Sequence, residues 1–243
     1  PRIQALALES RYDLRDYDRV TSVKSQGSYG TCWAFASFAS LESTGISTFG
    51  VRNYSEKHMA NLHGFDYEST KGGNHFMATA YLTRWAGPVY AQEDPYPDDR
   101  EWQSSPLGLS ERVHCQEVLF LPLDITSIKQ AVKDKGAVYT AFLVDSSNFK
   151  RTSSYTSYYY DGSPVSDIGG HAVTIVGWDD TFDRSRFVTA PPGNGALICK
   201  NSWGTSWGDK GYFYLSYYDY SFSGYADPTL FTAEPATNYG NIY

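Results

Sequence analysis

The sequence predicts an α+β fold with two lobes, in which a helical first half precedes a β-rich second half. Two observations favour this fold class. Apolar residues recur at helical spacing between about residues 31 and 85, whereas the chain after about residue 113 changes to short apolar or alternating runs. A chain of 243 residues can also bury a core without disulfide or metal cross-links. A cleft between two such lobes is where ligand sites concentrate.

Three helices are expected in the first half. An Ala-rich segment begins at Thr31, and its large apolar side chains are spaced by three: Phe35, Phe38 and Leu41. This spacing predicts a helix that is buried on much of its surface. Ser55 is a suitable N-cap for a second, short helix, and residues 76–85 form a third candidate.

The second half contains five runs that are typical of strands. They are Val118 to Leu121, Val138 to Val144, Ala172 to Val176, Ala196 to Lys200 and Gly211 to Tyr217. One helix interrupts them, because Ile128, Ala131 and Val132 fall on a single helical face. Gly136 is a suitable stop for that helix.

Composition and charge exclude several classes of protein. Aliphatic, aromatic and Cys residues make up 41% of the chain and charged residues 19%, which excludes a disordered chain. No apolar stretch approaches the roughly 18 residues that a membrane-spanning helix needs, so we expect no membrane insertion. The net charge is 20 − 27 = −7 and no run of Lys or Arg could follow a phosphate backbone, so nucleic acid is not an expected partner.

The cysteine pattern indicates free thiol chemistry without a structural metal. The chain has three cysteines, Cys32, Cys115 and Cys199, so at least one thiol is unpaired within the chain. None lies in a CxxC pair or in a Cys and His cluster of the zinc-binding type. We therefore predict no metal and no cofactor. One acidic group lacks EF-hand spacing and is expected to form a solvated loop: Glu93, Asp94, Asp98 and Asp99.

Three residues carry the candidate chemistry. Cys32 follows the turn 27–30 and opens the first helix, where free N–H groups and the helix dipole favour a thiolate. His171 follows two glycines and leads into an apolar strand, which puts an imidazole at the mouth of a rigid element. A Cys–His pair needs a third group to fix the ring, and Asn201, directly after the strand 196–200, can supply an oxygen for this.

Three sequence blocks resemble the signatures of papain-like cysteine peptidases, and they occur in the family's order. They are Gln26 to Phe35, Gly170 to Val173 and Lys200 to Gly204. The resemblance covers nearly the whole chain and implies one papain-like peptidase domain over residues 1–243. The helical lobe would span about residues 23–112 and the β-barrel-like lobe about residues 1–22 and 113–243, with the active-site cleft between them.

The resemblance implies a role for each residue at a matching position. Cys32 would be the nucleophile, His171 the general base and then the general acid, and Asn201 the group that orients the imidazole. Gln26 would complete an oxyanion hole with the backbone N–H of Cys32. Trp203 would shield the contact between Asn201 and His171 from water.

The resemblance also implies a substrate-binding cleft. Gly72 and Gly73 would pair with the backbone of an extended substrate. The pocket for the second residue before the scissile bond would be walled by one cluster: Asn74, His75 and Phe76. Opposite this cluster we place Gly170 and either Thr140 or Ala141. Because no charge is recognisable at the floor of this pocket, an apolar or aromatic substrate residue is expected there.

Departures from the family pattern bear on where the protein acts. Tyr29 and Thr70 stand where relatives carry a bridging pair of cysteines, and Leu62 replaces another, which leaves Cys115 without a mate. These features are more similar to bacterial and archaeal surface members of the family, some of which continue into a lectin-like domain. We therefore expect a secreted or cell-surface protein of prokaryotic origin. The chain opens at Pro1 without Met or an apolar leader, so we expect a targeting segment to have been removed.

The predicted function is that of a thiol protease, a hydrolase that cleaves peptide bonds through a thiolate–imidazolium pair and an acyl-enzyme. Its partners would be protein or peptide substrates and an inhibitory propeptide, and a monomer is expected. An acyl transferase or peptide ligase on the same Cys–His pair is an alternative, which only product analysis separates. A catalytically inactive surface binding module is a third, but such a module has no need of the full set Gln26, Cys32, His171 and Asn201.

Overall fold

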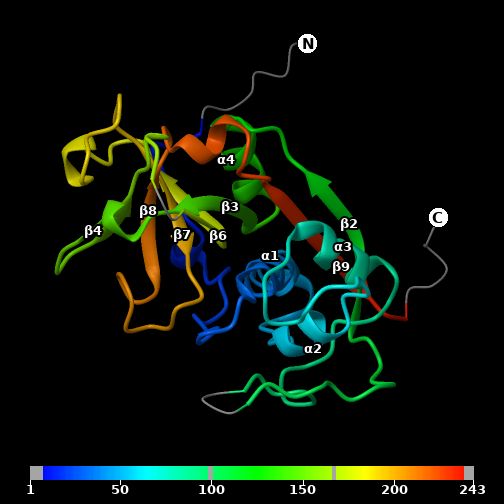
Figure 1. The fold of residues 1–243 in the computed structure, drawn as a ribbon. Coiled ribbons are helices and arrows are strands. Elements are labelled where there is room, and N and C mark those ends of the chain that lie inside the picture. Colours follow the sequence, from blue (N-terminus) through cyan, green and yellow to red (C-terminus); the bar gives the residue numbers. More distant parts are fainter. Residues whose placement is uncertain (1–7, 98–100, 166–167, 238–243) are drawn as a thin grey trace, which may run out of the picture.

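The computed structural model describes residues 8–97, 101–165 and 168–237 and has a helical part and a β-rich part. The helices α2 (Glu56–Asn61) and α3 (His75–Thr83) pack against the long helix α1 (Cys32–Phe49), which also contacts a large sheet. Figure 1 shows α1 in the centre, with α2 and α3 on one side and the strands β6 and β7 on the other. The α+β class expected from the sequence is confirmed.

Side-chain caps explain where the shorter helices begin. Ser55 caps α2 by accepting a hydrogen bond from the N–H of His58, as predicted. Asn74 caps α3 in the same way, so that this helix begins at His75, one residue before the predicted start. The fourth predicted helix is α4 (Ile125–Asp134). None of the helices in the described part of the chain is long and apolar enough to cross a membrane.

Nine strands form one sheet in the order β2–β9–β3–β6–β7–β8–β5–β4, with β1 paired to the end of β6. All of these pairs are antiparallel except the pair between β5 and β8. The five strands expected from the sequence are present: β3 and β7 have the predicted bounds, and β2, β6 and β8 have shifted ends. In the order β1 to β9, the bounds are Arg11–Asp13, Val113–Phe120, Val138–Val144, Phe149–Arg151, Thr156–Tyr158, Gly169–Asp179, Ala196–Lys200, Tyr212–Ser216 and Thr229–Pro235.

The sheet is open, which corrects the expectation of a barrel-like lobe. Its outer strands are β2 and β4, and these two are not paired with each other. At the β2 end, β9 packs on α1 and β2 packs on α3. Val113 and Phe231 are thereby buried in the core of the helical half. Helices cover the apolar side chains of these strands, so their burial does not require the sheet to close on itself.

Four strands were not predicted from the sequence, for two physical reasons. The strands β1, β4 and β5 have three residues each, which is too short for an alternating pattern to show. The strand β9 begins with three consecutive buried residues, Thr229, Leu230 and Phe231. Leu230 packs in one hydrophobic core and Phe231 in another, so both faces of the strand are buried and the alternation of a half-exposed strand is absent.

Two hydrophobic cores share the strands β3, β6 and β9. One lies between the sheet and α4 and contains Trp178 and Phe142, both fully buried. The other lies between the helices and includes Trp33 together with Ala172 of β6. The Thr174 hydroxyl donates a hydrogen bond of 3.2 Å to the carbonyl of Ala36, which joins β6 directly to α1. The first turn of α1 and the first residues of β6 are therefore held together.

A backbone bridge joins the two loops that relatives would link by a disulfide. Gly30 forms a parallel bridge with Lys71, and its N–H donates to the carbonyl of Thr70 at 2.7 Å. A Cβ atom at Gly30 would lie 2.8 Å from that carbonyl oxygen, so the close approach requires glycine. Tyr29 packs edge-on against Trp102, with ring centroids 4.8 Å apart. A hydrogen bond thus joins the two loops where a disulfide is missing, and aromatic packing joins the first loop to the segment at Trp102.

Gly177 tests how tightly β1 is seated on β6. A Cβ atom there would lie 2.3 Å from the carbonyl oxygen of Tyr12, so Gly177→Ala has to push β1 away from its partner. We expect a loss of about 1–3 kcal/mol in the free energy of unfolding, measured by urea denaturation. Gly169→Ala is the matched control, because it lies on the same strand with no atom within 4 Å of the added Cβ. Equal stability of the two variants would contradict the prediction.

Candidate active site

Cys32 lies at the N-terminus of α1, as the turn before it predicted. It is the first helical residue, so its sulfur is close to N–H groups that have no partner within the helix. The backbone N–H of Ala172 also donates to Sγ at 3.4 Å. Because β6 is joined to α1, this donor from the sheet points at a sulfur from the helical half. Both contacts favour negative charge on the sulfur.

Asn201 determines which nitrogen of His171 carries a proton. The Nε2 atom of His171 lies 2.8 Å from Oδ1 of Asn201, and the backbone N–H of Ser202 donates to the same Oδ1 at 2.8 Å. A backbone N–H can only donate, so this end of the amide is the oxygen. Nε2 must then be the protonated nitrogen, and Nδ1 keeps a free lone pair. The neutral imidazole is therefore in the tautomer that can accept a proton at Nδ1.

Trp203 covers the imidazole. Its indole stacks on His171 with ring centroids 4.5 Å apart and an angle of 26° between the planes. Trp207 packs edge-on against Trp203 at 4.9 Å, and Phe149 packs against both indoles. His171 is 7% exposed and Asn201 3% exposed, so their hydrogen bond is largely removed from water. Such a bond is stronger than one in solvent.

Gln26 is held with its amide nitrogen toward the turn that precedes Cys32. Its Nε2 donates to the carbonyl of Tyr29 at 2.7 Å, and its Oε1 accepts from the Ser202 hydroxyl at 2.7 Å. A carbonyl can only accept, so the orientation of this amide is also determined. An amide nitrogen carries two hydrogens, and the bond to Tyr29 uses one. The second is available to a ligand.

Tyr96 fastens the segment between Gln26 and Cys32, a role that the sequence did not predict. Its hydroxyl donates to the carbonyl of Gln26 at 2.9 Å and lies 2.6 Å from the hydroxyl of Thr31. Thr31 is fully buried and immediately precedes Cys32. The contact joins residues 65 positions apart in the sequence, and no local pattern marks such a pair.

Burial opposes a single charge on either member of the Cys–His pair. It raises the pKa of the Cys32 thiol, although N–H groups of Ala172 and α1 offset part of the effect. Burial also lowers the pKa of His171 to about 4, against the opposing effect of Asn201. A proton that moves from Sγ to Nδ1 creates both charges together, and their mutual attraction offsets the lost hydration. The pair is thus suited to internal proton transfer rather than to separate titration.

A cavity of about 670 Å³ opens beside Cys32 and His171. Several residues predicted for substrate binding line it: Gly73, Asn74, His75, Gly170 and, of the two alternatives, Ala141. Thr140 is instead fully buried and donates to the carbonyl of Ala226. Gly72 does not line this cavity, and neither does Trp203, which lies on His171. The structure therefore brings the two halves of the predicted cleft together around the thiol.

Phe76 borders a neighbouring hollow rather than this cavity. It is 58% exposed and lines the hollow together with Phe65, Tyr67, Gly73 and Asn74. Its ring also packs against His75, with centroids 4.0 Å apart. His75 thus lines the cavity beside Cys32, whereas Phe76, the next residue of α3, lines only the neighbouring hollow.

Four lining residues of the cavity were missed: Tyr139, Ala172, Tyr225 and Asp227. Tyr139 lies on β3 opposite Thr229, so the chain just before β9 is brought alongside the strand. This pairing joins positions about 90 residues apart. Nothing in the local sequence around Asp227 marks it as part of a cavity. Asp227 also places a carboxylate in the cavity, where the sequence had indicated no charge.

The other acidic and thiol groups are accounted for by local contacts. Glu93 pairs with Arg112. Asp94 is buried and pairs with Lys57 at 2.6 Å, which corrects the expectation of a solvated loop at this residue. Asp98 and Asp99 lie outside the described residues. Within the described ranges, no three His, Cys, Asp or Glu side chains come together as a metal site. Burial raises the pKa of Cys115 to about 12 and that of the fully buried Cys199 well above its usual value. Neither thiol is suited to be a nucleophile.

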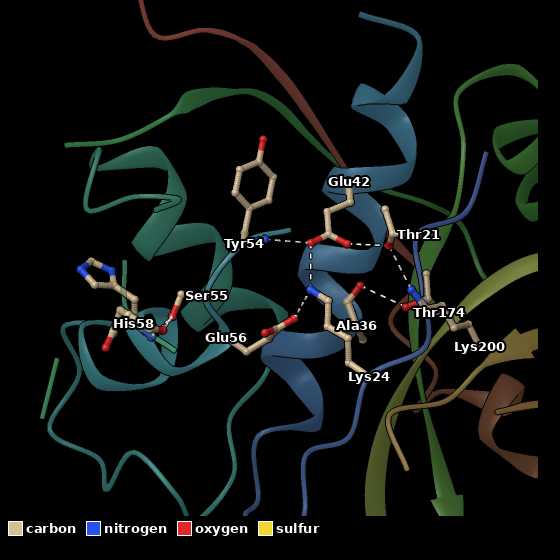
Figure 2. Close-up of polar contacts among 11 residues, drawn as sticks. Thr21, Lys24, Ala36, Glu42, Tyr54, Ser55, Glu56, His58, Thr174 and Lys200 are labelled. Atoms are coloured by element: carbon tan, nitrogen blue, oxygen red, sulfur yellow. Dashed lines mark hydrogen bonds and ion pairs between the residues drawn. The ribbon is translucent and has the colours of Figure 1, made fainter. Parts of the chain in front are cut away.

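Figure 2 shows a buried charge network beside α1. Lys24 lies between two carboxylates, with Nζ 3.0 Å from Glu42 and 2.7 Å from Glu56. The hydroxyl of Thr21 donates to Glu42 at 2.6 Å and accepts from Nζ of Lys200 at 3.1 Å. These five residues come from the segment before Gln26, from α1, from α2 and from the end of β7. We call them the charge network.

Burial and pairing compete within the charge network. Burial opposes the charge of Lys24, but Glu42 and Glu56 more than offset it and raise the pKa of Lys24. Lys200 has only a hydroxyl within hydrogen-bond distance, and burial lowers its pKa to about 8, with Glu42 opposing the shift. A cavity of about 290 Å³ separates parts of the network and reaches Asn201. Lys200 is therefore the least compensated charge of the set.

Comparison with known proteins agrees with this geometry. A model of the papain family cysteine proteases matches residues 8–228. The chain therefore belongs to the papain family of cysteine proteases, as its three sequence blocks predicted. A cysteine protease from Ambrosia artemisiifolia, Amb a 11.0101, is 27% identical over 219 residues, which covers 86% of this chain and 50% of that protein. The chain thus spans about half the length of this relative.

Two solved structures show the same fold. The cysteine protease and lectin-like domains of Cwp84, a surface-layer-associated protein of Clostridium difficile, match with a TM-score of 0.80 and 26% identity. The match covers 95% of this chain and 53% of that one. The bromelain protease from Ananas comosus, solved with the inhibitor E64, matches with a TM-score of 0.71 and 26% identity over 93% of this chain and 100% of that one. The papain-like fold expected from the sequence is confirmed.

Lys200 should leave a signature in the pH dependence of stability. Between about pH 8 and 10.5, unfolded Lys200 binds a proton that folded Lys200 has lost, so its contribution to stability rises with pH. Relative to Lys200→Met, the unfolding free energy of the wild type should therefore gain up to about 1.4 kcal/mol per pH unit in this range. Urea denaturation of both proteins at several pH values measures the difference.

The control for this experiment is Lys71→Met, which removes a lysine whose side chain is 65% exposed. Its difference from the wild type should stay nearly constant over the same pH range, since exposed charges are well hydrated in both states. A pH-independent difference for Lys200→Met as well would show that Lys200 keeps its charge when buried.

Proposed function

We propose that this chain is the peptidase domain of a cysteine endopeptidase. The observation that carries the proposal is the tautomer of His171, which leaves Nδ1 free at a cavity shared with Cys32. A general base with a free lone pair, a helix-terminal thiol and a neutral orienting amide are the parts that nucleophilic catalysis needs. Membership of the papain family supports the same activity. The domain would extend over residues 1–243, with its two lobes on either side of the cleft.

The first half-reaction forms an acyl-enzyme. The Sγ proton of Cys32 moves to Nδ1 of His171, and the thiolate attacks the carbonyl carbon of the substrate while the C=O π electrons move to oxygen. The backbone N–H of Cys32 and the second hydrogen of Gln26 Nε2 donate to that oxyanion. As the C=O bond re-forms, the C–N bond breaks and the imidazolium gives its proton to the leaving amine. A thioester on Cys32 remains.

The second half-reaction releases the acid. A water molecule gives a proton to Nδ1 of His171 as its oxygen attacks the thioester carbon. Collapse of the tetrahedral intermediate breaks the C–S bond, and the sulfur leaves as a thiolate beside the imidazolium. Asn201 holds the ring in one orientation throughout, because its oxygen accepts from Nε2 in every state. The pair is then ready for another turnover.

Two other functions use the same residues differently. If an amine rather than water attacked the thioester, the chain would act as an acyl transferase or peptide ligase. If the thioester never formed, the chain would be a surface binding module. The complete arrangement of Gln26, Cys32, His171 and Asn201 favours catalysis, because binding alone does not require a protonated Nε2 and a free Nδ1.

We further propose that the protein is exported and acts at or outside a prokaryotic cell surface on protein or peptide substrates. The likeness to Cwp84, which is described as surface-layer-associated, supports this proposal. The Cwp84 structure is also described after propeptide cleavage, which supports control by an inhibitory propeptide. A monomer suffices for the mechanism, since every group named above comes from one chain.

Product analysis tests the proposed reaction. The protein is incubated with a peptide library in reducing buffer, alone and with an added amine-terminated peptide, and all products are identified by mass spectrometry. We expect internal cleavage with two free products from each peptide, and none from Cys32→Ala. Ligated products that dominate when the amine is present would instead support the ligase, and intact peptides from the wild type would support the binding module. Terminal products alone would replace endopeptidase by exopeptidase action.

Gln26 and Asn201 should differ in how their loss affects the thiol. Gln26→Ala removes a donor needed only when the oxyanion forms, so kcat should fall about 10²- to 10³-fold while Cys32 keeps its reactivity toward iodoacetamide at pH 6. Asn201→Ala frees the imidazole and should lower both kcat and alkylation at pH 6. Cys115 and Cys199 serve as internal references, because burial keeps both protonated there.

The two measurements are kcat on a cleaved peptide and the alkylation rate of Cys32 between about pH 4 and 8. Retained alkylation in Asn201→Ala together with lost alkylation in Gln26→Ala would mean that the two roles are reversed. Equal labelling of all three cysteines in the wild type at pH 6 would contradict the thiolate–imidazolium pair itself.

A further inference from the structure

Among the described residues, one carboxylate lines the cavity beside Cys32, that of Asp227. The helical half supplies Gly73, Asn74 and His75 as one wall, and the sheet supplies the other. We infer that Asp227 makes this cavity a site for a cationic substrate side chain, that of Lys or Arg, close to the scissile bond. The inference rests on the proposed peptidase function and names its substrate class. It replaces the apolar specificity expected from the sequence.

The charge of Asp227 is not cancelled within the cavity. Its side chain is 56% exposed, and the nearest basic group is Nδ1 of His75 at 3.9 Å. His75 is buried, and burial lowers its pKa despite the nearby carboxylate, so its imidazole is neutral at pH 7. His171 also borders the cavity, but its positive charge arises together with the negative charge of the Cys32 thiolate. No lysine or arginine of the described chain lines the cavity.

Two aromatic rings give the cavity the shape for a long cationic side chain. Tyr139 is almost fully buried, whereas Tyr225 is 39% exposed at the rim. A Cβ atom at Gly170 would lie 2.0 Å from the hydroxyl oxygen of Tyr225, so the ring can lie against the backbone only because Gly170 has no side chain. Aromatic faces accept the methylene stem of Lys or the plane of a guanidinium. The charged end can then reach the exposed carboxylate.

An apolar side chain fits this arrangement less well. It would contact Tyr139 and Tyr225 equally, but it would also displace water from the carboxylate of Asp227 without supplying a partner. An acidic side chain would add a like charge. A cationic side chain alone satisfies both the rings and the carboxylate, and its attraction to a half-exposed partner should weaken as salt is added.

Matched peptide substrates separate charge from shape. Arginine is compared with citrulline, its neutral isostere, at the first, second and third positions before the cut. At low salt we expect kcat/KM to be at least about tenfold higher for the arginine peptide than for the citrulline peptide at one of these positions. At the other two positions the two peptides should give about equal kcat/KM. The resemblance indicates that arginine is preferred at the second position before the cut. In Asp227→Asn the ratio at that position should fall to about one, and added salt should lower it in the wild type.

Asp66→Asn is the matched control variant. It removes the same charge from the neighbouring hollow and not from the cavity, so it should keep the arginine-to-citrulline ratio of the wild type. Asp227→Lys should invert the preference in favour of glutamate over glutamine at the same position. Equal rates for arginine and citrulline in the wild type, or an unchanged ratio in Asp227→Asn, would overturn the inference.

A binding measurement separates this inference from the proposed function. If no peptide is cleaved, the peptidase proposal fails, and the same peptide pair is titrated into Cys32→Ala by fluorescence anisotropy. Tighter binding of the arginine peptide to Cys32→Ala, lost in the double variant with Asp227→Asn, supports a cationic site whatever the chemistry. Equal binding of the two peptides to Cys32→Ala overturns it.

Discussion

The charge network is the interaction on which the geometry of the site depends. Lys24 precedes Gln26 by two residues. Glu42 lies on α1, the helix that begins at Cys32, and Lys200 directly precedes Asn201. Each buried charge loses several kcal/mol of hydration, and only close partners offset that loss. The segment before Gln26, α1 and α2 therefore cannot separate without leaving Lys24, Glu42 or Glu56 unpaired. The end of β7 is joined to them through the hydrogen bond from Lys200 to Thr21, in a chain whose three described cysteines are all unpaired.

Neutral groups do the positioning at the reacting atoms themselves. Gln26 and Asn201 are both amides, and a carbonyl or a backbone N–H that can act in only one way determines how each is turned. Before proton transfer the thiol, the imidazole and the amides carry no charge, and after it the two charges sum to zero. The site can thus be buried under Trp203 without a net charge to solvate. A carboxylate in place of Asn201 would lose this balance and would also favour a proton resting on the ring.

Local chemistry explains which parts of the site the sequence could predict. Cys32 follows a turn of breakers at a helix start, His171 follows paired glycines, and Asn201 follows an apolar strand, so each leaves a mark within a few residues. Helices and long strands were predictable for the same reason. The charge network, Tyr96 and Asp227 depend instead on pairings between distant segments, such as the register that sets Tyr139 opposite Thr229. Whether the sheet is open or closed also depends on contacts between distant segments, here the packing of β9 on α1 and of β2 on α3.

The reacting groups and Asp227 differ in how firmly the fold constrains them. The groups proposed to react are held by contacts of α1, β6 and β7, where one change disturbs several partners. Asp227 lies on the segment before β9, which is attached through the backbone carbonyl of Ala226 to the hydroxyl of Thr140. That bond leaves the side chain at position 227 free to differ. On the proposals above, the residues that react and the residue that sets the specificity lie in separate parts of the fold. A change of charge at one half-exposed position would then leave the buried contacts of the reacting residues unaltered.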